Sequence, residues 1–244
     1  MQRKFSGIPF LSVSLREATV QLISHAKSKQ GVSYHLVNAY SIVSASKNPA
    51  YQNLLEFSKT NLADGFPISL LTQFSRSPIT QIRGMDFFME ILGMCEAENL
   101  SIFFWGSTDQ VLNAIRQRAE SEFPKLQIAG MYSPPFGDSP SEQDRDSLGL
   151  IQSSGASLVL VALGTPKQDL EAHRIAVNTG ATTVAIGAAF DFYAGTKPEA
   201  PRWVAKLGFE WLFRLVTEPR RLWKRYVFGN VQFLVQVLKK RAPK

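Results

Sequence analysis

Short apolar runs, rich in β-branched residues, recur along this chain with helix-like stretches between them. This alternation constrains the fold, because strands that are apolar on both faces need helices on both sides of a parallel sheet. The pattern predicts an α/β fold with a Rossmann-like, mostly parallel sheet flanked by helices. The expected strands are residues 32–37, 100–105, 127–131, 158–163 and 182–186.

Helix start signals follow several of these runs and place loops at the carboxyl edge of the sheet. Such loops form the usual ligand site of an open parallel sheet. A capping side chain, a proline in the first turn, or an acid or amide three residues after the cap marks a helix start. The expected starts are Asn48 with Pro49, Ser107 with Gln110, and Ser141 with Asp144.

The alternation stops near Pro201, and the remaining sequence is helical in pattern, with breaks expected near Gly208, Pro219 and Gly229. We therefore expect a Rossmann-like core of residues 1–196 and a helical appendage of residues 197–244. The appendage is basic, with 12 Lys/Arg and 3 Asp/Glu, whereas residues 1–196 hold 15 and 17. Such a block attracts the phosphate groups of lipids, nucleic acids or phosphorylated substrates.

Composition excludes several classes of protein. Apolar residues make up 45% of the chain and charged residues 19%, which is typical of a globular protein. The single cysteine, Cys95, excludes an intrachain disulfide framework, so we expect a reducing, cytoplasmic setting. No apolar run reaches the roughly 18 residues of a membrane span. The amino-terminal stretch also lacks the apolar core of a signal peptide.

Common nucleotide and metal motifs are missing. The chain contains neither G-x-G-x-x-G nor the P-loop pattern. Asp144 and Asp146 resemble a metal-binding D-x-D, but residues two apart on a helix do not share a face, so a solvated helix start is favoured. His25, His35 and His173 are scattered, without ligand spacing. We expect no metal and no cofactor.

The stretch TNLADGFP places an acid, Asp64, directly before Gly65, between two expected helices. A turn explains this pair without any chemistry, because glycine accepts positive φ and aspartate can bond its own backbone. The alternative is a general base, since Leu62, Phe66 and Pro67 form a partly apolar niche that would make the carboxylate more basic. The residues alone leave both interpretations open.

Two strand ends are rich in small residues. In VALGTPKQD, Pro166 suits a first helical turn, so backbone N–H groups near Lys167 and Gln168 would face an anion. In IGAAFDFYAGT, small side chains would let a ligand approach the backbone closely. An ordinary turn and tight helix packing explain these two stretches equally well.

Basic and aromatic residues alternate in the appendage. Arg214, Arg221 and Arg225 fall on one helical face, because steps of seven and four return to the same side. Guanidinium groups suit a diphosphate, and aromatic residues mixed with basic ones suit the headgroup layer of a membrane. A docked helix with a solvated basic face is the alternative, and so apolar a tail suits nucleic acid less well than a lipid surface.

Over nearly its full length, the chain resembles the bacterial WecG/TagA/CpsF glycosyltransferase family, glycosyltransferase family 26. The matching stretches occur in family order: VNAYSIV, NLADGFPI, RGMDFF, IFFWGS, YSPPF, VALGTPKQD, IGAAFDFYAGT and APRWVAKLGFEWLFRLVTEPRRLWKRYVFG. The resemblance implies an inverting, metal-independent transferase that moves a sugar from a UDP-sugar to a polyprenyl-diphosphate-linked saccharide. It also implies a role in cell-surface or exopolysaccharide synthesis, at the inner face of the bacterial membrane.

The resemblance assigns roles to single residues. Asp64 would be the general base that takes a proton from the acceptor hydroxyl. Arg214, Arg221 and Arg225 would bind diphosphate. The donor-binding set would be Asn38, Arg83, Gly106, Gly164, Lys167, Gln168 and Asp191. No nucleic-acid partner is expected, and homo-oligomer formation stays open.

The sequence departs from the family pattern at three positions. Leu36 stands where threonine is common, and Gln81 and Glu199 stand where arginine is common, with Arg83 as a candidate replacement for the first arginine. These departures, together with YSPPF, leave the donor sugar open between hexose, uronic acid and N-acetylhexosamine. They also motivate the alternative of a non-catalytic, membrane-associated scaffold with the same fold.

Overall fold

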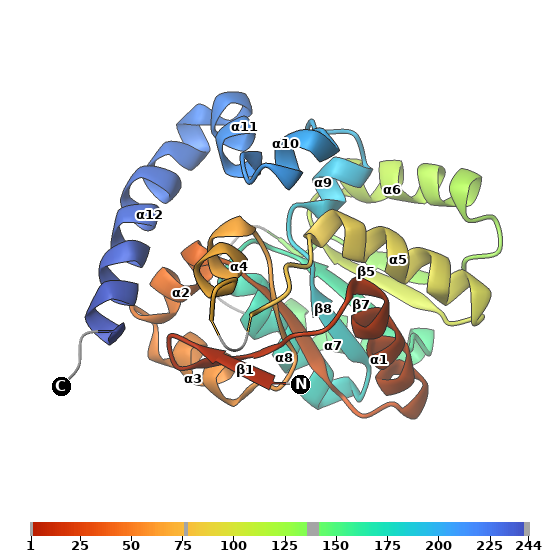
Figure 1. The fold of residues 1–244 in the computed structure, drawn as a ribbon. Helices are drawn as coiled ribbons and strands as arrows, with labels where there is room; N and C mark the ends of the chain where they lie inside the picture. Colours follow the sequence, from red (N-terminus) through yellow and green to blue (C-terminus); the bar gives the residue numbers. More distant parts are fainter. Residues whose placement is uncertain (1, 76–77, 136–141, 242–244) are drawn as a thin grey trace. The chain divides into compact units, whose positions relative to one another are not determined.

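The computed structural model describes residues 2–75, 78–135 and 142–241 (Figure 1). The chain divides into two compact units. The first unit combines Met1–Val13, Leu36–Arg83 and Pro198–Lys244, and the second combines Ser14–His35 and Gly84–Lys197. All but the first residue of the expected appendage therefore belongs to the same unit as the Asp64 region.

A six-stranded sheet has the order β4-β3-β8-β7-β5-β6. The pairs β3–β8, β8–β7, β7–β5 and β5–β6 are parallel, which confirms the predicted α/β fold. Each of the five expected strands is present, with ends shifted by no more than two residues. The strands are β3 (Ser33–Val37), β4 (Asn61–Ala63), β5 (Ile102–Gly106), β6 (Ile128–Tyr132), β7 (Leu158–Ala162) and β8 (Thr182–Ala185).

The second unit buries its strands between two layers of helices. Successive side chains of a strand point to opposite faces, so Phe103 and Trp105 pack in a cluster with Ile175 of α8. Phe104 points the other way, and its ring centroid lies 6.4 Å from that of Phe88 on α5. The helices of this unit are α1 (Leu15–Ser28), α5 (Gly84–Ala97), α6 (Asp109–Glu122), α7 (Glu142–Ser154), α8 (Lys167–Thr179) and α9 (Ala189–Tyr193).

Of the three helix starts that the sequence signals predicted, the structure confirms one and shows that another is wrong by one residue. Asn48 caps its helix as predicted, with its side chain accepting a hydrogen bond from the Tyr51 amide. The predicted Ser107 cap is wrong by one residue, because Thr108 caps α6 and Ser107 has a φ of 62°. The third expected cap, Ser141, lies outside the described residues.

The first unit is built around a hairpin, the end of the sheet and the appendage helices. Strands β1 (Gln2–Phe5) and β2 (Ile8–Leu11) pair antiparallel. Helix α12, the dark blue helix of Figure 1, packs on α2. The ring centroid of Phe233 on α12 lies 6.1 Å from that of Phe5 on β1. The helices are α2 (Ala39–Ala45), α3 (Pro49–Phe57), α4 (Phe66–Thr72), α10 (Arg202–Lys206), α11 (Glu210–Thr217) and α12 (Pro219–Arg241).

The appendage is helical, as predicted, with breaks at Gly208 and just before Pro219. The expected break at Gly229 is wrong, because α12 runs continuously from Pro219 to Arg241. A Cβ at Gly229 would lie 3.7 Å from the Tyr40 ring of α2, which is an ordinary packing distance. Within the described residues, no helix combines the length and apolar character that a membrane crossing requires.

Candidate active site

A pocket in the first unit collects residues from distant parts of the chain. They come from the loop after β3, the loop after β4, the segment before α5 and the appendage. Asp64, Gln81 and Arg214 all line it, although they are far apart in sequence. The remaining lining residues are Asn38, Ala39, Tyr40, Gly65, Phe66, Pro67, Gly208, Glu210, Trp211 and Asn230.

Asp64 is placed by the end of a strand, not by a loop between two helices. Strand β4 ends at Ala63, and the Asp64 amide donates to the Val37 carbonyl at 2.9 Å. Gly65 then turns the chain into α4 with a φ of 86°, a value that residues with a Cβ rarely adopt. The expectation of two flanking helices is therefore wrong on the amino-terminal side. The Asp-Gly pair does form a turn, and the turn directs a half-buried acid into the pocket wall.

Asn38 also follows a strand and begins a helix. Its side-chain oxygen accepts a hydrogen bond from the Ser41 amide at 3.1 Å, and the Ser41 hydroxyl accepts one from the Asn38 amide. This capping box fixes the side chain at the pocket. Because the cap uses the side-chain oxygen, the side-chain nitrogen, Nδ2, is the group of Asn38 that is suited to bind a ligand.

The appendage supplies the guanidinium group of the pocket and one of its aromatic side chains, in addition to Tyr40 and Phe66 from elsewhere in the unit. Glu210, Trp211 and Arg214 lie on α11, which begins at Glu210. Residues four apart on a helix share a face, so Glu210 and Arg214 reach the same pocket. Trp211 is 38% exposed and adds an aromatic surface. Aromatic faces of this kind pack well against the C–H groups of a sugar ring.

Arg83 does not line the pocket. Its Nε donates to Glu210 at 3.0 Å, and a terminal nitrogen donates to Glu199 at 3.1 Å. Glu199, one of the departures from the family pattern, is therefore paired with a cation of its own unit. Gln81, the departure beside Arg83, does line the pocket. No sequence pattern predicts these ion pairs, because Glu199 and Glu210 are 116 and 127 residues away from Arg83.

The other expected donor-binding residues lie at strand ends of the second unit. Gly106 ends β5, and Gly164 follows β7. Gln168 is buried, and its side-chain oxygen accepts a hydrogen bond from the Gly164 amide at 3.1 Å. The backbone N–H of Gln168 donates to the Gly164 carbonyl. The sequence predicted that this N–H would face an anion, and that prediction is wrong. Lys167 is the exposed first residue of α8.

Three further expected residues are held differently from one another. The Asp191 carboxylate pairs with Lys197 at 2.6 Å in the second unit. Arg221, in the first turn of α12, pairs at 2.7 Å with Glu218, the residue directly before that helix. Arg225 belongs to α12, but its side chain lies outside the described part of the structure. Of the predicted diphosphate ligands whose side chains are described, Arg214 lines the pocket and Arg221 does not. The expectation that Arg214, Arg221 and Arg225 share one helical face is wrong, because Arg214 lies on α11 and the other two lie on α12.

The second unit contains a buried polar network that the sequence did not reveal. His35 Nδ1 lies 3.2 Å from the Asp169 carboxylate, and both side chains are fully buried. Ser33 connects His35 to His173, and burial with the nearby His35 lowers the pKa of His173. Ser33, His35 and Asp169 are buried whereas His173 is exposed, so the network runs from the interior of the unit to its surface.

The described residues contain no cluster of side chains with the composition of a metal site. Across the described ranges, no group of three or more His, Cys, Asp or Glu side chains is close enough to hold an ion. The side chains of Asp144 and Asp146 are not among those described, so this statement does not extend to the D-x-D stretch. Cys95 is buried, and burial raises the pKa of its thiol to about 12.

A parallel α/β sheet with polar loops at its strand ends is the architecture of many enzymes that bind nucleotides. Residues 3–244 match the model of the glycosyl transferase WecG/TagA/CpsF family. The chain belongs to that family and is a glycosyltransferase.

Two curated relatives come from Bacillus, and both are named N-acetylglucosaminyldiphosphoundecaprenol N-acetyl-β-D-mannosaminyltransferase. The protein of Bacillus subtilis strain 168 is 29% identical over 242 residues, which cover 98% of this chain and 91% of the relative. The protein of Bacillus spizizenii strain W23 is 28% identical over 197 residues, which cover 80% of this chain and 74% of the relative.

Proposed function

We propose that this protein transfers a sugar from a UDP-sugar to a saccharide carried on a polyprenyl diphosphate, with inversion at the anomeric carbon. The observation that carries the proposal is the pocket of the first unit, in which an acid, Asp64, and a guanidinium, Arg214, come from distant parts of the sequence. The names of the two relatives support the acceptor class, because both contain a diphosphoundecaprenol.

The proposed reaction is a single displacement. Asp64 takes the proton of an acceptor hydroxyl while that oxygen forms a bond to the anomeric carbon. The bond from the anomeric carbon to the UDP oxygen breaks, and UDP leaves with the electron pair. A sugar that is α-linked in UDP-sugar then becomes β-linked, as in the products that the relatives' names describe. A placed carboxylate base typically contributes about 10²–10⁴ in rate.

Diphosphate needs positive charge near it, and the appendage supplies that charge. Arg214 lines the pocket and is the first candidate ligand for a diphosphate, with Arg221 and Arg225 as further candidates from α12. Guanidinium groups bind phosphate oxygens with two parallel hydrogen bonds, which fixes the orientation of the group. Such fixed charge stabilises negative charge that develops as a phosphate leaves.

For the donor, we propose as candidate contacts, within the second unit, Gly106, Gly164, Lys167, Gln168 and Asp191. Within the first unit, Asn38 is a separate candidate, because it lines the pocket. The support for Gly106, Gly164, Lys167 and Gln168 is their position at or just after the carboxyl ends of parallel strands, where ligands of such sheets bind. Asp191 lies in helix α9 and is supported by the family resemblance alone. The donor is a UDP-linked hexose, uronic acid or N-acetylhexosamine. The relatives' names favour an N-acetylhexosamine as the first donor to test.

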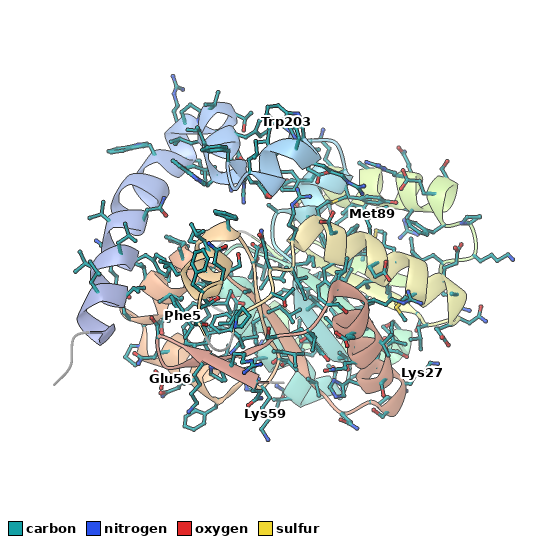
Figure 2. The ribbon with its side chains drawn as sticks, in the orientation of Figure 1. Phe5, Lys27, Glu56, Lys59, Met89 and Trp203 are labelled. Atoms are coloured by element: carbon teal, nitrogen blue, oxygen red, sulfur yellow. The ribbon has the colours of Figure 1, made fainter. Side chains whose placement is uncertain are left out.

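We further propose that the protein works at the cytoplasmic surface of a bacterial membrane. The support is a set of exposed apolar side chains on a basic appendage, and Figure 2 labels Trp203, which is 67% exposed. Apolar side chains mixed with basic ones favour binding at an anionic lipid surface. The other side chains in this set are Leu207, Phe209, Trp211, Leu212, Val216, Trp223, Val231, Leu234, Val235 and Leu238.

The experiment that tests the proposed reaction measures UDP release and product mass with a synthetic polyprenyl-diphosphate saccharide. The donors are UDP-N-acetylmannosamine, UDP-N-acetylglucosamine, UDP-glucose and UDP-glucuronic acid. We expect one donor to give release only when the acceptor is present, and the new linkage to be β. Absence of transfer with every donor, together with retained sedimentation on anionic vesicles, would favour the scaffold alternative instead.

A further inference from the structure

We propose that Arg83 is a positioning residue, which fixes helix α11 at the pocket and so determines how Arg214 and Trp211 meet the acceptor. This inference deepens the proposed function and rests on it. It differs from the donor-binding role that the family resemblance gives to Arg83. In this proposal, Arg83 does not contact the donor and instead controls the geometry of the pocket.

The geometry of Arg83 is that of a clamp between two segments. Its side chain is 13% exposed, whereas those of Glu199 and Glu210 are 36% and 30% exposed. Two different nitrogens of one guanidinium make the two contacts. Glu199 precedes α10 and Glu210 begins α11, so Arg83 spans the whole of α10. A lysine could supply the charge but not this fixed fork of donors.

Helix α11 carries the effect of the clamp to the pocket. Glu210 is the first residue of α11, and Arg214 lies one turn later on the same face. Both residues line the pocket, as does Trp211. The turn before the helix is tightly packed as well, because a Cβ at Gly208 would lie 2.5 Å from the Phe66 ring. With its start fixed by Glu210, the helix has little freedom to move Arg214.

Charge argues against anion binding by Arg83 itself. Two carboxylates already pair with the one guanidinium of Arg83, so its positive charge is compensated and attracts a nucleotide phosphate only weakly. Releasing Arg83 to a ligand would also leave two partly buried carboxylates without this partner, which is unfavourable. The contacts of Arg83 therefore favour holding the appendage over holding the donor.

Four variants separate these roles: Arg83→Met, Arg83→Lys, Glu210→Gln and the control Lys47→Met. Lys47 also joins the appendage to the rest of its unit, through Gln232 of α12 at 2.8 Å, but it does not line the pocket. We expect Arg83→Met and Glu210→Gln to lower kcat/KM for the lipid acceptor about tenfold. We expect the KM for UDP-sugar to stay within about twofold and Lys47→Met to match the wild type.

A donor-binding role makes the opposite prediction. Arg83→Met would then raise the KM for UDP-sugar and leave that for the acceptor unchanged, and Glu210→Gln would not reproduce it. That result would overturn the proposal. The exchanged pair Arg83→Glu with Glu210→Arg supplies a second test, because regained acceptor kinetics relative to Arg83→Glu alone would support a direct contact.

Hydrogen exchange tests the clamp without any assay of the reaction. We expect amides of Glu210–Thr217 to exchange faster in Arg83→Met than in wild type or Lys47→Met, while amides of β8 stay unchanged. Arg83→Lys should fall between Met and wild type. Unchanged exchange in α11 would overturn the clamp even if transfer activity is found. Faster exchange would support it even if no donor and acceptor pair reacts, so failure of the proposed function stays distinguishable.

Discussion

The two units use aromatic and charged side chains in opposite ways. In the second unit, the ring centroid of Phe88 lies 5.0–6.4 Å from the ring centroids of Tyr193, Phe190 and Phe104. The His35–Asp169 pair of this unit is fully buried. In the first unit, charged groups line a pocket and many apolar side chains of the appendage are exposed. We therefore expect the buried side chains of the second unit to contribute more to the free energy of unfolding. In the first unit, groups that are available for binding contribute less to that free energy.

The largest effect on stability is expected from Phe88→Ala in the second unit. Phe88 is fully buried, and loss of its ring should lower the free energy of unfolding by about 3–5 kcal/mol. Urea unfolding measures this change. Phe57→Ala in the first unit is the control, because its side chain is 82% exposed and should change stability by less than about 0.5 kcal/mol. Equal changes in the two variants would break the comparison between the units.

Arg214→Met should show the converse behaviour in the first unit. Removal of a fixed charge from the site should lower turnover about 100-fold, while the urea midpoint stays near that of the wild type. The readout is the steady-state rate of UDP release with the lipid acceptor. Arg220→Met, an exposed arginine of α12 that does not line the pocket, is the matched control. If both variants lose activity equally, the pocket is not the site.

A smaller effect concerns pH and the second unit. His25 contacts the Tyr34 hydroxyl at 2.9 Å, and burial lowers the pKa of His25 below its ordinary value. The unfolded chain then binds a proton that the folded chain does not, so stability falls as pH drops through the unfolded value of about 6.5. His25→Gln should reduce the loss of urea midpoint between pH 7.5 and pH 5. An unchanged pH dependence would mean that His25 does not couple to folding.

The buried strands were predictable from the sequence, because each forms an apolar run that is long enough to be recognised without other information. Strand β4 was missed, since it has only three residues and begins with Asn61. The side-chain nitrogen of Asn61 donates to the carbonyls of Pro9 and Leu55, and no local pattern reveals such partners. The hairpin was missed too, although Ser6 and Gly7, both with positive φ, match a known two-residue hairpin turn.

The candidate site was predictable only in part. Local chemistry suggested Asp64 and the tail arginines, and the family resemblance suggested that they act together. The pairing of Arg83 with Glu199 and Glu210 was not predictable, because it depends on how the chain returns to the first unit after residue 197. Long-range ion pairs leave no periodic signal in a sequence. The donor-binding set stays a prediction.

The central claim is that the Asp64 carboxylate takes the proton of the acceptor. Single-turnover transfer by Asp64→Asn, with donor binding followed in parallel by the shift in melting temperature, tests it most directly. We expect the donor to raise the melting temperature as in the wild type, while the transfer rate constant falls by about 10²–10⁴. Transfer at the wild-type rate would show that another group accepts the proton and would contradict the account.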